Sequence, residues 1–278
     1  FKTVGFLEVK EKDQQDEQST NIPVIIPAAG EDTIFKEILD GKPKAMLEIC
    51  GKTLLDHQIQ TLNNANLADI TLISGYGKEK LHAEGVNIME NPDYKKGSML
   101  NSLLIAKEKM VNGFIMLYSD ILMEDHILSK LMECKEDIIL VADNSTQYHL
   151  PEEGNFLDYI ISKSQHKPER REIRFISENI VANIGNKINP ETATHEFIGL
   201  ARFSKTGAEQ FLETYNDVIS NFAGPFQESK DISSLTFTDL VQEMIDRGFA
   251  IHFMEIHKGW LEIHNTDHIA LAQKSFSA

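Results

Sequence analysis

Three charged side chains in the sequence could do chemistry together: Lys44, Asp120 and Glu262. Asp120 follows the apolar run of residues 114–118, where a carboxylate can serve as one of the few protein ligands that Mg²⁺ requires. A turn or helix-capping aspartate is the structural alternative. Glu262 lies in an apolar strand, where a buried charge needs a partner. Alternation along that strand could equally place Glu262 in solvent.

His264 would share the strand face of Glu262 and is a further candidate metal ligand. A lone histidine is also commonly a hydrogen-bonded structural residue, so both interpretations stay open. The histidines lack the His-Glu-x-x-His spacing of a zinc site, and the sequence contains no Gly-x-Ser-x-Gly. The absence of Gly-x-Ser-x-Gly weighs against a hydrolase of the type that carries this motif.

Lys44 ends a loop that could hold a phosphate. Residues 22–27 are a short β-branched apolar run, which predicts a buried strand. The run leads into Ala28, Ala29 and Gly30, where the backbone can approach a ligand closely. Backbone amides followed by a cation suit a phosphate group. The spacing is neither that of a P-loop nor the full Gly-x-Gly-x-x-Gly of dinucleotide-binding proteins, and a solvated lysine is the alternative for Lys44.

The segment of residues 91–103 carries hydroxyl and amide side chains at an expected helix start, among them Asn91, Ser98 and Ser102. A helix N-cap is the simpler interpretation, and contact with a base or a phosphate is the functional one.

Two stretches of the second half offer charged contacts. Glu196 and Asp239 are candidates for contacting an amine of the substrate. The basic stretch of residues 163–174 is either the solvated face of a hairpin or a contact for an anionic substrate or a partner subunit.

The elements that position these side chains alternate between strand and helix in the first half. We expect strands over residues 69–74, 86–89, 113–118 and 137–142, and helices over residues 54–62, 98–110 and 127–132. The second half is expected to add antiparallel strands within residues 156–186, strands over 196–202, 250–256 and 260–264, and helices over 206–215, 235–247 and from residue 266. This pattern favours a three-layer α/β fold with a mostly parallel, Rossmann-like sheet and an antiparallel insertion. Gly30, Gly75 and Asp120 fall at carboxyl ends of strands, where such sheets bind ligands.

Composition limits the partners. The 278 residues carry 43 acids against 27 bases, a formal net charge of −16, which disfavours nucleic acid and anionic membranes. No apolar run is long enough to span a membrane and no signal peptide is apparent, so we expect a cytoplasmic setting. Residues 1–20 are expected to be a linker or the tail of a preceding domain, and the absence of an initial methionine suits a piece of a longer protein.

Taken in order, several motifs resemble the nucleotidyltransferase superfamily. The matching stretches are residues 23–30, 42–47, 51–55, 75–79, 91–94, 102–103, 117–122, 196–200 and 259–263. The chain resembles most the phosphonate cytidylyltransferase domains associated with phosphoenolpyruvate mutase, and more distantly the phosphocholine cytidylyltransferases.

The resemblance implies one nucleotidyltransferase domain over residues 21–278 that couples CTP to a small phosphonate, such as 2-aminoethylphosphonate, or to a phosphomonoester. It implies that Lys44 and Asp120 are catalytic, and that Mg²⁺ is held by Asp120 and Glu262 with His264 as a softer ligand. The implied nucleotide-binding residues are Ala28, Ala29, Gly30, Gly75, Tyr76, Ser98 and Ser102, and the substrate-binding residues Asn91, Tyr94, Glu196 and Asp239. Fusion to or pairing with a phosphoenolpyruvate mutase, and a homodimer, are the implied protein partners.

Two positions depart from the family pattern. Ile34 stands where the family usually carries a phosphate-clamping arginine, and His264 stands where much of the superfamily carries an aspartate. The alternatives are a phosphocholine or sugar-phosphate nucleotidylyltransferase, and a nucleotide-binding domain with weak or no catalysis. A glycosyltransferase usually carries Asp-x-Asp, whereas residues 119–122 offer one aspartate.

Overall fold

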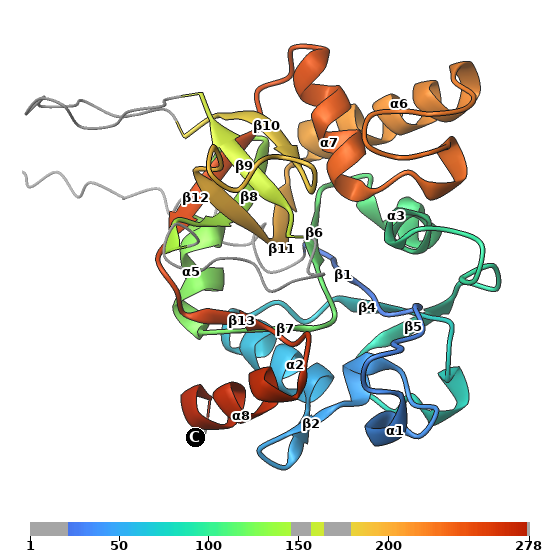
Figure 1. Ribbon diagram of the computed structural model, residues 1–278, viewed down its shortest axis with the longest axis vertical. Helices are drawn as coiled ribbons and strands as arrows, with labels where there is room; N and C mark the ends of the chain where they lie inside the picture. Colours follow the sequence, from blue (N-terminus) through green and yellow to red (C-terminus); the bar gives the residue numbers. More distant parts are fainter. Residues whose placement is uncertain (1–21, 146–156, 164–178, 277–278) are drawn as a thin grey trace, which may run out of the picture.

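A computed structural model describes residues 22–145, 157–163 and 179–276 of the chain. The predicted linker of residues 1–20 and most of the basic stretch of residues 163–174 lie outside these ranges. The predicted fold class is confirmed, since a mixed sheet with a parallel core lies between two layers of helices (Figure 1). In the described part of the chain, no helix has the length and apolarity needed to cross a bilayer.

Four parallel strands form the half of the sheet that carries the predicted loop. They lie in the order β6-β1-β4-β5 and comprise β1 (Val24–Pro27), β4 (Ile70–Ser74), β5 (Asn87–Glu90) and β6 (Phe114–Leu117). All four residues of β1 are buried, as expected for a strand covered on both faces. The carboxyl ends of β1, β4 and β6 therefore meet at one edge.

The other half of the sheet is largely antiparallel and is organised around the long strand β11 (His195–Phe203). β11 pairs antiparallel with β6, with β8 (Ile138–Asp143) and with β9 (Tyr159–Ser162). β9 pairs with β10 (Val181–Gly185), and β12 (His252–Ile256) runs parallel to β8. The expected antiparallel insertion is therefore present.

Alternating side chains of the sheet divide the core between two faces. Ile25, Phe114 and Met116 pack with α3 (Met99–Leu103), α6 (Lys205–Asn221) and α7 (Phe237–Asp246). Val24, Ile26 and their neighbours pack with α2 (Leu54–Asn64) and α5 (Asp125–Glu133). A smaller cluster lies under α1 (Lys36–Leu39) and α8 (Thr266–Ser275).

Gly199 interrupts β11 at a point where only glycine fits. Its φ of +80° lies in the left-handed region, and a Cβ atom there would come within 2.4 Å of the Tyr118 ring. The register of β11 against β8 shifts between Phe197 and Ala201, which is a bulge around this glycine. The bulge leaves room for the ring of Tyr118, which lies two residues before Asp120 in the sequence.

Two local predictions are wrong in detail. The helix expected over residues 98–110 is divided into α3, a 3₁₀ turn (Leu104–Ala106) and α4 (Lys107–Met110). Apolar spacing alone does not separate these helix types. The strand β7 (Ile121–Met123) was not expected, and it pairs antiparallel with β13 (Trp260–Glu262). This pairing brings Glu262 next to Asp120 across 142 positions of sequence, since Ile121 lies opposite Glu262.

The remaining elements are short. A hairpin joins β2 (Glu48–Ile49) and β3 (Lys52–Thr53), and 3₁₀ turns cover Lys44–Met46, Lys78–Lys80 and Ile232–Ser234. Lys44 therefore begins a 3₁₀ turn directly after Pro43, which fixes where its side chain leaves the backbone.

Candidate active site

A cavity of about 270 Å³ lies at the carboxyl ends of β1 and β6. It brings together eight residues singled out from the sequence, namely Ala28, Ala29, Gly30, Lys44, Tyr94, Ser98, Ser102 and Asp120. The other lining residues are Pro27, Glu31, Asp32, Gly97, Met99 and Ser119. A small loop, a cation, a carboxylate and hydroxyl groups thus face one space.

Lys44 lies between two carboxylates in this cavity. Its Nζ atom donates a hydrogen bond to Oδ2 of Asp120 over 2.9 Å and lies 3.5 Å from Oδ2 of Asp32. Burial acts to lower the pKa of Lys44, but Asp120 and Asp32 outweigh burial and raise it above its usual value. Lys44 is therefore a fixed positive charge, and its side chain is only 14% exposed.

Asp32 is a site residue that sequence reasoning missed. Its Oδ1 atom accepts hydrogen bonds from the backbone of Ile34 and Phe35, both over 2.8 Å, while Oδ2 faces Lys44. An aspartate two and three residues before these amides is a common turn-forming pattern, and that signal was available in the sequence. Ile34 itself is 63% exposed on this loop.

The loop of residues 28–30 is fixed by the neighbouring strand end. The amide of Tyr76 donates to the carbonyl of Ala29 over 2.9 Å. A Cβ atom at Gly75 would lie 2.7 Å from that carbonyl and 2.8 Å from the Tyr94 ring, so a side chain would not fit there. Gly75 and Tyr76 therefore hold the loop in place through Ala29. Their contact with a nucleotide stays a prediction.

The segment between Asn91 and Ser102 is held together by its own polar groups. Ser98 caps α3 by accepting from the amide of Asn101, and the side chain of Asn91 donates to Ser102 over 3.0 Å. Asn91 and Ser102 are both buried. The simpler interpretation from the sequence, a helix cap, is present in the structure, and Ser98 and Ser102 also reach the cavity wall.

Glu262 lies beside Asp120 and close to His264. The amide of Ile263 donates to the carbonyl of Asp120 over 3.0 Å, which fixes the end of β13 against Asp120. Oε2 of Glu262 lies 2.9 Å from Nε2 of His264, and this contact raises the pKa of His264. Burial raises the pKa of Glu262, and the charge of Asp120 raises it further. The two carboxylates therefore repel one another.

The donor chemistry of this pair fits Mg²⁺. Mg²⁺ prefers oxygen ligands and is commonly bound by one or two carboxylates, with phosphates and water completing its shell. Asp120 and Glu262 are two mutually repelling carboxylates, and a cation would relieve that repulsion. Within the described residues, no group of three or more His, Cys, Asp and Glu side chains is arranged to hold a metal ion. The magnesium ligand set therefore stays a prediction, and His264 here contacts Glu262.

Glu196 and Asp239 lie in different environments. Glu196 is 8% exposed, and burial together with the charge of Glu262 raises its pKa to about 8. Asp239 is buried at the start of α7, where it accepts hydrogen bonds from Glu228, Ser229 and Thr236. Both carboxylate oxygens of Asp239 thus take part in structural hydrogen bonds, and its contact with an amine stays a prediction.

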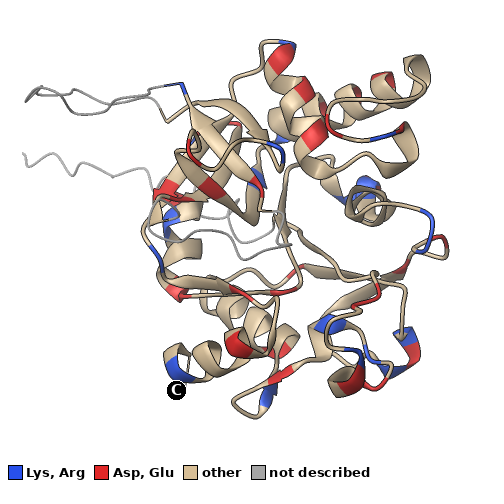
Figure 2. Cartoon of the chain, in the orientation of Figure 1, with Lys and Arg blue, Asp and Glu red and all other residues tan. Residues whose placement is uncertain are grey.

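Asp158 is a second residue that sequence reasoning missed. It directly precedes β9, and its carboxylate accepts from Tyr118 over 3.3 Å and from Thr238 over 3.4 Å. Burial and the charge of Glu262 raise its pKa to about 7. The sequence offered no signal, because Asp158 is brought to Tyr118 only by the pairing of β9 with β11. Figure 2 shows that acidic positions lie on strands of the sheet as well as on outer helices.

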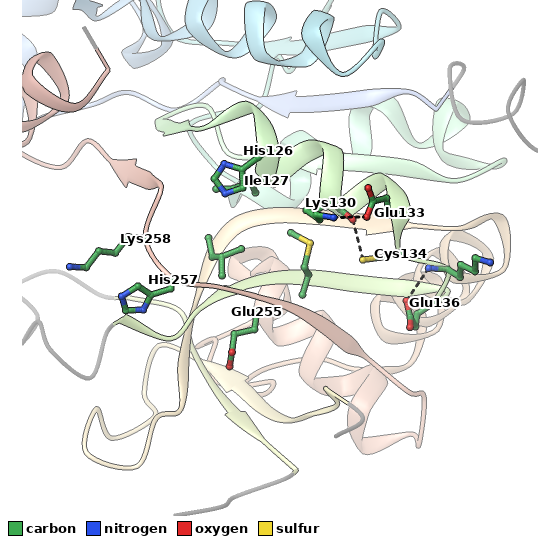
Figure 3. Close-up of a pocket in the computed structure, with 12 residues that line it drawn as sticks. His126, Ile127, Lys130, Glu133, Cys134, Glu136, Glu255, His257 and Lys258 are labelled. Atoms are coloured by element: carbon green, nitrogen blue, oxygen red, sulfur yellow. Dashed lines mark hydrogen bonds and ion pairs between the residues drawn. The ribbon is translucent and has the colours of Figure 1, made fainter. Parts of the chain in front are cut away.

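A larger cavity, of about 610 Å³, lies between α5 and β12 (Figure 3). Its wall includes His126, Lys130, Cys134, Glu255 and His257. None of the residues singled out from the sequence lines it. The candidate site is therefore chosen by the converging charges of the smaller cavity and not by cavity size.

Comparison with known proteins places the chain in a family. The model of the MobA-like NTP transferase domain matches residues 24–172, which is more than half of the chain. The chain is 23% identical over 252 residues to the CTP:phosphoglutamine cytidylyltransferase of Campylobacter jejuni, covering 86% of this chain and 94% of that protein. It is 32% identical over 95 residues to the choline-phosphate cytidylyltransferase of Streptococcus pneumoniae, covering 33% of this chain and 42% of that protein.

Solved structures share the fold. The CTP:phosphocholine cytidylyltransferase of Streptococcus pneumoniae superposes with a TM-score of 0.67 at 16% identity, over 92% of this chain and 99% of that chain. The inositol-1-phosphate CTP transferase of T. maritima gives a TM-score of 0.68 at 16% identity, over 92% and 94% of the two chains. The match over residues 24–172 includes the loop, Lys44 and Asp120, and the chain belongs to the MobA-like NTP transferase domain family.

Proposed function

We propose that this protein is a CTP-dependent cytidylyltransferase that couples CTP to a small phosphonate, for example 2-aminoethylphosphonate, or to a phosphomonoester. Membership of an NTP transferase family supports the nucleotide triphosphate as one substrate. The names of the similar proteins from Campylobacter jejuni and Streptococcus pneumoniae support cytidine as the base and a small phosphate compound as the acceptor.

The observation that carries this proposal is the ion pair between Lys44 and Asp120 at the mouth of the loop of residues 28–30. An NTP would bring three phosphates into a cavity whose cation is already in place. Lys44 is held within 2.9 Å of Asp120, so its charge is oriented before the ligand arrives. Phosphate oxygens would share Lys44 with Asp120, and backbone amides at the end of the loop, around Gly30, would supply further donors.

Asp120 and Glu262 would hold Mg²⁺ in this proposal. When bound, the ion neutralises phosphate charge and supports departure of pyrophosphate. The protein residues would provide the remaining charge neutralisation and the positioning. Lys44 offsets negative charge on the triphosphate, and the β7–β13 pairing keeps Glu262 beside Asp120.

The proposed reaction is an in-line substitution at the α-phosphorus of CTP. An oxygen of the acceptor phosphonate forms a new bond to that phosphorus, and the bond to the bridging oxygen of the β-phosphate breaks. Pyrophosphate leaves with the electron pair. The attacking oxygen is already anionic at neutral pH, so the step requires positioning and charge neutralisation rather than a dedicated general base.

A second candidate is a nucleotide-binding domain with weak or no catalysis. Ile34 favours it, because this side chain is 63% exposed on the loop and offers no charge to a phosphate. Measurement of CTP binding by calorimetry beside turnover separates the two candidates. Binding of CTP with no pyrophosphate release across the acceptor panel supports the second candidate.

The test of the proposed function is release of pyrophosphate by the purified chain. Release should require CTP, Mg²⁺ and an acceptor together, and CTP should be preferred over ATP, GTP and UTP. The acceptor panel comprises 2-aminoethylphosphonate, phosphocholine and a sugar 1-phosphate. Equal rates with all four nucleotides, or no release with any acceptor, would sink the proposal.

A further inference from the structure

The candidate active site holds an excess of negative charge for a cavity that would receive a triphosphate. Among the described residues that line this cavity, Lys44 alone carries a positive charge, against the carboxylates of Glu31, Asp32 and Asp120. The charge of Glu262 also acts on Lys44. Phosphates entering here would meet one cation and several anions, and like charges repel. Asp120 and Glu262 have a use in the proposed magnesium site, whereas Asp32 has none there.

Asp32 carries a fixed charge that is largely shielded from water. Its side chain is only 10% exposed, and its Oδ1 atom accepts hydrogen bonds from the amides of Ile34 and Phe35, both over 2.8 Å. These two bonds hold the carboxylate in one orientation, so Oδ2 stays directed at Nζ of Lys44, 3.5 Å away. A partly buried charge is screened less than an exposed one. The charge of Asp32 therefore acts strongly on a group that binds at Lys44.

The two carboxylates beside Lys44 are not equivalent. Asp120 is at hydrogen-bond distance, 2.9 Å, whereas the 3.5 Å between Asp32 and Lys44 exceeds the usual length of such a bond. Within the described part of the chain, Lys44 is the one cation that pairs with Asp32. A phosphate group that binds Lys44 takes this partner from Asp32 and leaves two anions facing one another.

We propose that Asp32 is a specificity-determining residue that makes nucleotide binding depend on a divalent cation. Its carboxylate repels a metal-free triphosphate at Lys44 and admits the Mg²⁺ complex, in which the metal already offsets part of the phosphate charge. This role rests on the proposed function, and it consists of rejecting ligands rather than binding them. A repulsive charge placed against the wrong ligand is a general route to specificity.

The charges of the ligands set the size of the effect. Metal-free CTP carries roughly four negative charges and its Mg²⁺ complex roughly two, and repulsion by a fixed charge is proportional to the charge of the ligand. On a logarithmic scale, removal of the Asp32 charge should therefore improve the binding of metal-free CTP about twice as much as that of the complex. Inorganic tripolyphosphate should follow metal-free CTP, because the repulsion acts on phosphates and not on the base.

The Asp32→Asn variant tests the residue by calorimetric titration of the full chain with CTP, in EDTA and in excess Mg²⁺. Asparagine keeps a side-chain oxygen that can accept from Ile34 and Phe35, and it lacks the charge. The affinity for metal-free CTP and for tripolyphosphate should rise at least about tenfold, with a gain of only about threefold for the Mg²⁺ complex. Unchanged or weaker binding of metal-free CTP in this variant overturns the inference.

Asp40→Asn is the matched control for the loss of one negative charge. Asp40 lies at the end of α1, its side chain is 93% exposed, and it pairs with Lys80 over 3.7 Å. Its φ of +46° is a backbone conformation that asparagine tolerates. The control should bind each ligand within about twofold of the wild type, since exposed pairs contribute little. An equal gain in both variants would reflect the general charge of the protein and contradict the role of Asp32.

Two other roles for Asp32 predict different results. If Asp32 were a ligand to Mg²⁺, Asp32→Asn would bind the Mg²⁺ complex more weakly than the wild type does. If Asp32 only formed the turn before α1, Asp32→Asn would bind every ligand as the wild type does, and Asp32→Ala, which lacks the acceptor oxygen, would bind more weakly. Either pattern contradicts the inference.

These titrations measure binding without turnover, so the two proposals can fail separately. Absence of pyrophosphate release counts against the proposed function alone. A gain of at least about tenfold in the binding of metal-free CTP and tripolyphosphate by Asp32→Asn still supports the inference in that case. If neither the wild type nor Asp32→Asn binds these ligands, with or without Mg²⁺, the inference is rejected.

Discussion

The Nζ atom of Lys44 lies 2.9 Å from Oδ2 of Asp120, although 76 positions of sequence separate the two residues. The contact joins the end of the β1 loop to the end of β6, so it depends on the parallel pairing of β1 with β6. With Asp32 at 3.5 Å, Lys44 is held by carboxylates on two sides. A cation held in this way is ready for phosphate oxygens without further ordering of its side chain.

Lys44→Ala should reduce kcat/KM for CTP by about 10²–10³-fold, the usual cost of removing one preorganised charge from a reaction centre. Pyrophosphate release at several CTP concentrations measures the loss. Lys130→Ala is the control, because Lys130 forms an exposed pair with Glu133 on α5. We expect that variant to keep at least half of the wild-type rate. Full activity of Lys44→Ala would refute the role given to Lys44.

Gly199→Ala should destabilise the protein by about 2–4 kcal/mol, because it adds backbone strain and an overpacked contact. The added Cβ atom would meet the Tyr118 ring at 2.4 Å at a φ of +80°. Gly224→Ala is a matched control, since Gly224 has a φ of +87° with nothing within 4 Å of the added atom. In urea unfolding, the control variant should lose only the free energy that corresponds to the backbone strain, about 1 kcal/mol. Equal losses in the two variants would mean that the Tyr118 contact is unimportant.

The parts of the site that the sequence predicts are those that local patterns encode. The strand and small residues of 22–30, the strand before Asp120 and the helix cap at Ser98 each follow from residue types within a few positions. Their meeting at one edge follows from the parallel arrangement, because strand ends of one direction share an edge. Eight of the predicted residues line one cavity for that reason.

The parts that were missed depend on pairing between distant segments. β7 is only three residues long and directly follows Asp120, so its apolar run is too short to predict a strand. Asp158 reaches Tyr118 only because β9 pairs with β11, whose residues lie more than 30 positions further along the chain. The structural use of Asp239 also escaped the sequence, because its partners Glu228 and Ser229 come from a loop that folds back on α7.

Ile34→Arg should raise kcat/KM for CTP by about 3- to 10-fold, because a cation on the exposed loop adds a phosphate contact at the edge of the cavity. The substitution should cost little stability, as Ile34 is 63% exposed. Ile38→Arg is the control, since this substitution adds the same charge four residues further along the chain. Ile38 is 57% exposed and therefore tolerates the change as Ile34 does. A gain shared by both variants would reflect the general charge of the protein. An unchanged or lower value for Ile34→Arg contradicts the prediction.

Glu196 should make the protein less stable as pH rises. The unfolded carboxyl group titrates near its ordinary value of about 4.3, whereas the folded value is about 8. Between these values the folded state keeps a proton that the unfolded state has lost. The free energy of unfolding therefore falls with rising pH across this window. Among the residues that the structure describes, Asp143, Asp158, Glu262 and Tyr159 interact electrostatically with Glu196, and none of these four carries a positive charge.

Glu196→Gln removes this dependence, because glutamine does not titrate. The variant should match the wild type at about pH 5 and exceed its free energy of unfolding by at least ~1 kcal/mol at about pH 8.5. Urea unfolding at the two pH values measures the difference, and Glu133→Gln should follow the wild type at both. A variant less stable than the wild type at the higher pH would mean that Glu196 is ionised and well partnered in the folded protein.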